Sequence, residues 1–99
     1  MYVVRDIMQC KPGKVREMVD RFKAVNALAV RMGAKPGRIL TDVSGETFWT
    51  IVGEFEVETI DEFFDMMAKM FANEEAGRIM AGYHDGVQGG RREIFKVEA

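Results

Sequence analysis

The sequence lacks most of the motifs that would place a protein in a familiar catalytic class. It has no GxGxxG dinucleotide motif, no P-loop, no HExxH or CxxC metal motif and no GxSxG serine-hydrolase motif. Its one cysteine, Cys10, cannot form an internal disulfide, which fits a reducing compartment. No apolar run approaches the roughly 20 residues that span a bilayer, and residues 1–8 lack the pattern of a signal peptide. We therefore expect a cytoplasmic protein that has no metal site and no cofactor.

A strong charge of either sign is also missing. The formal net charge of the 99 residues is −2, and basic and acidic side chains are interspersed. The chain therefore has no positive field to attract nucleic acid or an anionic membrane, and we predict neither as a partner. Hydrophobic residues make up 47% of the chain and charged residues 30%, a balance typical of a globular protein. This length predicts a single domain over residues 1–99.

What the sequence does contain is a clear alternation of strand and helix patterns. Residues rich in β-branched and apolar types predict strands at 2–10, 38–43, 47–57 and 91–98. Helical spacing predicts one helix from residue 14 to about Gly33, and a second that is capped by Thr59, breaks near Asn73 and continues to Tyr83. The order β-α-β-β-α-β predicts a ferredoxin-like α+β sandwich, with a four-stranded antiparallel sheet and two helices on one face.

The segment SGETFWTIVGEFEV, residues 44–57, raises the question of what covers the other face of this sheet. One face of the predicted strand carries Trp49, Ile51 and Phe55, and the other carries Phe48 and Val52. Either face would form an apolar patch of several hundred Å² in water, about the limit for a soluble monomer. A second copy of the chain can cover it, so we predict a homodimer whose sheets pack face to face.

Three segments resemble a known superfamily: the turn KPGK at residues 11–14, the hairpin sequence GETFWTIVGEFE and the segment RREIF at 91–95. With the element order, they resemble the dimeric α/β-barrel superfamily, and within it small NIPSNAP-like and antibiotic-biosynthesis-monooxygenase-like proteins. The resemblance implies a homodimer with a barrel-like interior and a cleft between sheet and helices in each subunit. Members include cofactor-free monooxygenases acting on aromatic polyketides, haem-degrading enzymes, lactone isomerases and many proteins of no known activity.

Asp6 is the candidate catalytic residue. It shares a strand face with Val4 and Met8, which makes it a lone carboxylate among apolar neighbours. Such a group can act as a desolvated general base or orient a ligand. The alternative is a carboxylate paired across the sheet with an arginine such as Arg38 or Arg92.

Five further residues are candidate ligand contacts: Asn26, Trp49, Phe55, Tyr83 and His84. Trp49 and Phe55 can line an aromatic pocket, or belong to the sheet core and dimer interface. Asn26 and Tyr83 bring polar groups to apolar helix stripes, where bonding within the protein is the alternative. His84 is the only histidine and could shuttle a proton or serve as a surface or capping residue. Haem-degrading relatives use an Asn, a Trp and a His that this chain matches poorly, so we predict no haem.

Three functions follow from these residues. The first is a NIPSNAP-like dimer that binds a small apolar or aromatic molecule. The second is a cofactor-free monooxygenase or isomerase with Asp6 as its base, since such enzymes need mainly burial, orientation and a base. The third is a regulatory or interaction domain without catalysis. An RNA-recognition module has the same element order, but Glu46, Glu54 and Glu56 flank the strand that would stack bases, which disfavours it.

Overall fold

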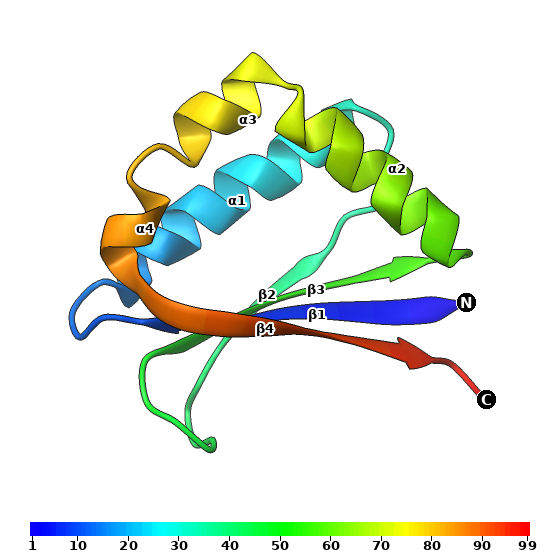
Figure 1. Cartoon of the computed structure of the whole chain (residues 1–99). Coiled ribbons are helices and arrows are strands. Elements are labelled where there is room, and N and C mark those ends of the chain that lie inside the picture. Colours follow the sequence, from blue (N-terminus) through cyan, green and yellow to red (C-terminus); the bar gives the residue numbers. More distant parts are fainter.

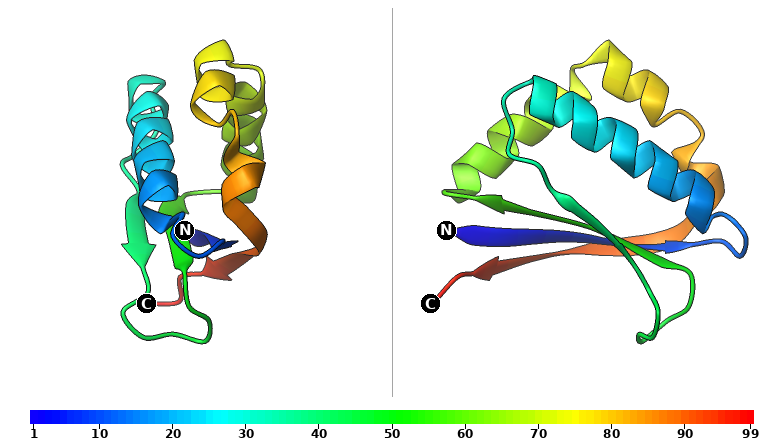
Figure 2. Two further views of the ribbon diagram at one scale, coloured as in Figure 1. Left: turned by 90° about the vertical axis from the view of Figure 1, so that its left-hand side faces the viewer. Right: turned by 180° about the vertical axis from the view of Figure 1, so that it is seen from behind.

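A four-stranded antiparallel sheet with helices on one face forms the protein (Figure 1), in a computed structural model that describes residues 1–99. The strands are β1 (Tyr2–Cys10), β2 (Arg38–Thr41), β3 (Thr50–Val57) and β4 (Val87–Lys96), and they lie in the order β2-β3-β1-β4. The helices are α1 (Val15–Arg31), α2 (Ile60–Phe71), α3 (Glu74–Ile79) and α4 (Tyr83–Gly86). Figure 2 shows α1 in one row and the other helices in a second row beside it. The predicted ferredoxin-like sandwich is confirmed.

The helix ends follow local signals in the sequence. The Thr59 hydroxyl accepts a hydrogen bond from the Glu62 backbone N–H at 3.1 Å and caps α2, as predicted. The Glu62 carboxylate accepts from the Glu58 N–H at 2.7 Å, one residue earlier than a standard capping box would place it. Asn73 caps α3 through the Ala76 N–H at 3.0 Å, which accounts for the predicted break.

The predicted strand at 47–57 is three residues too long at its start. Trp49 has a φ angle of 62°, which is outside the β region, and β3 therefore begins at Thr50. The Asp42 carboxylate accepts a hydrogen bond from the Thr50 N–H at 2.7 Å and closes the end of the hairpin, so β2 ends at Thr41 rather than at residue 43. The loop of residues 42–49 projects from the sheet on the side away from the helices (Figures 1 and 2).

The last strand begins at Val87, earlier than the predicted start at residue 91. Gly89 and Gly90 lie in β4 and pair with Gln9 and Met8 of β1. Gly90 is needed there because a Cβ atom would lie 2.9 Å from the backbone carbonyl oxygen of Ile7. The helical segment ends in stages, since Gly82 has a φ of 80° and separates α3 from α4.

The hydrophobic core is divided into two clusters on the helix-covered face. The first contains Cys10, Met18, Val19 and Ile51, and the second contains Val4, Val57 and Phe63. Between them, one row of the sheet register runs through Ile39, Gly53, Asp6 and Arg92. A glycine and an ion pair cannot supply core packing, so the two clusters stay separate across this row.

The face of the sheet that no helix covers carries a row of alternating charges. The register places Arg38, Glu54, Arg5 and Glu93 side by side across the four strands. The Glu54 carboxylate accepts hydrogen bonds from Arg38 and from Arg5 Nε, the latter at 2.9 Å, and its side chain is only 10% exposed. The bond from Arg38, and then the bond from Arg5, lower the pKa of Glu54 against the opposing effect of burial.

We predict that Glu54 makes the protein lose stability in acid. Because the pKa of Glu54 is lower in the folded protein than in the unfolded chain, its contribution is present above about pH 4.3 and is lost as the pH falls through the folded value. The Glu54→Gln variant should show a smaller loss of unfolding free energy between pH 6 and pH 3, measured by urea denaturation. Glu46→Gln, in the exposed loop before β3, is the control. An unchanged acid profile in Glu54→Gln would contradict the prediction.

Candidate functional site

An open cleft of about 660 Å³ lies between the sheet and the helices. Its volume is in the range typical of small-molecule sites. The floor includes Met8, Gly53 and Phe55 from the sheet, and one wall includes Phe22 and Val25 from α1. Four methionines of α2 and the α3 end line it as well: Met66, Met67, Met70 and Met80. In the sequence, these methionines are spaced along the second predicted helical segment, and this spacing is the signal that could have found them.

The wall of the cleft meets its floor at Gly53. The Phe22 ring of α1 lies 3.5 Å from the position that a Cβ atom on Gly53 would occupy, which is an ordinary van der Waals distance. Gly53 is opposite Asp6 in the register, so the middle of the floor carries no bulky side chain from β3. Neither Phe22 nor Gly53 was singled out from the sequence, because only the packing of α1 on the sheet brings them together.

Asp6 lines the cleft and is held by Arg92. Arg92 Nε donates to Asp6 Oδ1 at 2.5 Å and Arg92 Nη2 donates to Oδ2 at 3.3 Å, across neighbouring positions of β1 and β4. The Arg92 guanidinium also lies 4.8 Å from the centre of the Phe63 ring. The structure thus contains the arginine pairing that was the alternative to a free carboxylate. The role of Asp6 as a catalytic base stays a prediction.

Tyr83 brings a hydroxyl group to the α4 end of the cleft. Its Oη donates to the Met8 Sδ at 3.7 Å, and its ring meets the His84 ring edge-on with centres 4.9 Å apart. Burial raises the pKa of the Tyr83 phenol, and the charges of Asp6 and Cys10 raise it further. Tyr83 is therefore a protonated donor at neutral pH, and both it and His84 line the cleft.

Asn26 lines the cleft on the side of α1 and is partly used by the backbone. Its Oδ1 accepts a hydrogen bond from the Gly37 N–H at 3.0 Å, which ties the loop before β2 to α1. A Cβ atom on Gly37 would lie 2.9 Å from the Glu54 carbonyl oxygen, so this close approach requires glycine. Asn26 thus has the structural role foreseen as its alternative, while it also borders the cleft.

The aromatic candidates separate in the structure. Phe55 lines the cleft and contacts Phe63 with ring centres 5.6 Å apart. Trp49 is 44% exposed and Phe48 is 80% exposed, and both lie in the loop before β3, outside the residues that line the cleft. The sequence did not show this separation because the turn at Trp49 interrupts the alternation that would have placed it beside Phe55.

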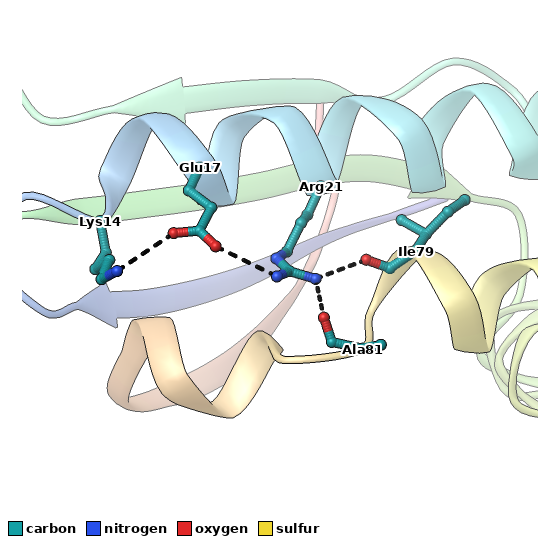
Figure 3. A network of polar contacts seen from close by, with 5 residues as sticks. All are labelled: Lys14, Glu17, Arg21, Ile79 and Ala81. Atoms are coloured by element: carbon teal, nitrogen blue, oxygen red, sulfur yellow. Dashed lines mark hydrogen bonds and ion pairs between the residues drawn. The ribbon is translucent and has the colours of Figure 1, made fainter.

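Arg21 of α1 holds the segment that carries Tyr83 and His84 (Figure 3). Its Nη1 donates to the carbonyl oxygen of Ile79 at 2.9 Å and also to that of Ala81, where α3 has ended and its last carbonyls need donors. Its Nη2 pairs with Glu17 at 3.4 Å. Arg21 thereby joins the two rows of helices at this end of the cleft.

We predict that Arg21→Met lowers the free energy of unfolding by about 2 kcal/mol, because hydrogen bonds from a charged group to the Ile79 and Ala81 carbonyls are lost. Arg16→Met is the matched control, since Arg16 is exposed on the same helix, and it should change stability by less than about 0.5 kcal/mol. Urea denaturation measures both. Equal effects of the two substitutions would show that Arg21 has no such role.

Two further properties of the chain bear on the site. No group of three or more His, Cys, Asp or Glu side chains is placed so that it could hold a metal ion. None of the helices has both the length and the apolar composition required to cross a membrane.

Comparison with solved structures shows a shared fold. An uncharacterized NIPSNAP domain protein from Burkholderia xenovorans aligns over 100% of this chain and 96% of its own, with a TM-score of 0.83 and 15% identity. A NIPSNAP family protein of unknown function from Agrobacterium tumefaciens aligns over 98% and 87%, with a TM-score of 0.83 and 12% identity. A candidate antibiotic biosynthesis monooxygenase from Nitrosomonas europaea aligns over 100% of both chains, with a TM-score of 0.75 and 13% identity.

The sequence comparisons add no closer relative. No family model matches the chain, and no curated protein matches it. The structural neighbours therefore confirm the fold that the sequence resemblance implied, that of NIPSNAP and antibiotic-biosynthesis-monooxygenase-like proteins.

Proposed function

We propose that the protein binds a small apolar or aromatic molecule in the cleft between its sheet and its helices. The observation that carries this proposal is the unfilled volume of about 660 Å³, half of whose lining residues are hydrophobic, with Phe22 and Phe55 among them. The apolar side chains that line this open cleft face water in the free protein, and this exposure costs free energy that a bound apolar ligand would regain. The unbranched methionines Met66, Met67, Met70 and Met80 can adapt to the outline of such a ligand.

A cofactor-free monooxygenase or isomerase is the alternative. The presence of Asp6, Asn26 and Phe55 around one cleft supports it, because such a reaction needs a base beside a buried apolar substrate. Against it, both carboxylate oxygens of Asp6 accept hydrogen bonds from Arg92, so neither oxygen is free to approach a substrate proton. A purely regulatory or interaction domain is less favoured, since it would not require an unfilled cleft.

The eight methionines allow a direct test of the binding site. We predict that the aromatic hydrocarbon 2-isopropenylnaphthalene shifts the NMR signals of the Met8, Met66, Met67, Met70 and Met80 methyl groups, which line the cleft. Met1, Met18 and Met32 lie outside its lining and serve as controls within the same spectrum. The measurement is a titration of protein labelled with ¹³C at the methionine methyl groups. Unperturbed cleft methyls, or equal shifts in the controls, would refute the proposed site.

We also propose that a second copy of the chain covers the helix-free face of the sheet. Apolar side chains border the row of charges on this face: Val3, Ile7, Leu40, Val52 and Phe95. The formal charges on this face cancel. Three arginines balance three glutamates there: Arg5, Arg38 and Arg91 against Glu54, Glu56 and Glu93. Two copies can therefore face each other without net repulsion.

The loop of residues 42–49 supports the same arrangement. It projects beyond the helix-free face and exposes Val43, Phe48 and Trp49 to water in a single chain (Figures 1 and 2). A four-stranded face of this strand length covers about 500 Å², which is less than the roughly 800 Å² per partner of a standard interface. The projecting loop supplies additional apolar area at the edge of that face.

Substitution of one exposed apolar residue on each side of the molecule tests the dimer. Leu40→Lys, on the helix-free face, should convert the dimer to a monomer, because it places a charge in the proposed interface. Phe71→Lys is the matched control: Phe71 is 85% exposed at the end of α2, on the helical side, and its replacement should leave the dimer intact. Native mass spectrometry measures both. A monomeric wild-type protein would overturn the proposed assembly.

A further inference from the structure

We propose that Tyr83 selects ligands that present a neutral, hydrogen-bond-accepting oxygen, such as a ketone carbonyl on an aromatic ring, at the α4 end of the cleft. This inference rests on the proposed small-molecule site. It adds the polar group that the ligand carries and the side chain that donates a hydrogen bond to it. It is based on three contacts: Tyr83 with Met8, Tyr83 with the core, and Asp6 with Arg92.

The Tyr83 hydroxyl has a weak partner that a ligand can replace. Its hydrogen bond goes to the Met8 thioether sulfur at 3.7 Å, and a thioether is a poor acceptor. A carbonyl oxygen is a stronger acceptor, so a ligand that offers one gains a bond without breaking a comparable one. The position of the hydroxyl is fixed in advance, because the Tyr83 ring packs against the core cluster of Cys10, Met18 and Ile51.

A ligand carboxylate fits this end of the cleft less well. Arg92 is already paired with both oxygens of Asp6, so its charge is not free to receive an anion. The Asp6 charge also reaches the Tyr83 hydroxyl, as its effect on the pKa of that phenol indicates. A second carboxylate there would be repelled by Asp6, whereas a neutral carbonyl would not.

Three probes of similar shape test this inference: 2-acetonaphthone, which carries a ketone oxygen; 2-isopropenylnaphthalene, which has a CH₂ group in its place; and 2-naphthoate, which is an anion. The wild-type protein should bind the ketone about fivefold more tightly than the hydrocarbon, as one added hydrogen bond implies. It should bind the naphthoate more weakly than the ketone. Affinities are measured by fluorescence titration, and methionine-methyl NMR verifies that each probe occupies the cleft.

The Tyr83→Phe variant should bind 2-acetonaphthone and 2-isopropenylnaphthalene equally, with the hydrocarbon affinity unchanged, because only the hydroxyl is removed. Tyr2→Phe, which alters a tyrosine outside the cleft lining, should retain the fivefold preference. If the wild-type protein binds all three probes alike, or if Tyr83→Phe keeps the preference, this inference is overturned while the proposed site stands. If no probe shifts the cleft methyls, the proposed function fails and this inference fails with it.

Discussion

The ion pair between Asp6 and Arg92 lies at the centre of the helix-covered face, and the rest of the site is arranged around it. Together with Gly53 it forms a row across the sheet that cannot be packed as hydrophobic core. The apolar residues therefore gather at both ends of the strands, around Ile51 on one side and Val4 on the other. The helices rest on these two clusters, and the cleft is the space between them.

Much of the fold is predictable from the sequence, and the site is less so. The element order, the Thr59 cap and the break at Asn73 follow from signals within a few residues. The start of β3 does not, because the positive φ of Trp49 interrupts an apolar pattern that looks continuous. The partner of Asp6 depends on which residue of β4 lies opposite, so the sequence left both a free carboxylate and an arginine pair open.

The packing of the helices on the sheet decides which candidate residues come together. Asn26, Phe55, Tyr83 and His84 border the same cleft as Asp6, although these five residues come from four different elements. In the sequence, each of these residues stands out only as a polar or aromatic side chain within an apolar pattern. Their shared location follows from the helices meeting the sheet at two separate clusters, and no local pattern encodes that.

The same division of the core bears on assembly. Only 11 of 99 residues are buried, so a single chain draws little stability from its core and also keeps a cleft unfilled. A second copy would bury exposed apolar residues on the helix-free side of the sheet, including Leu40, Phe95 and Phe48. The cleft lies on the other side and would stay open. The dimer would then stabilise a subunit whose interior is kept available for a ligand. The proposed assembly and the proposed binding would thus use opposite faces of the same strands, and β1 contributes to both faces, with Arg5 on one and Asp6 on the other.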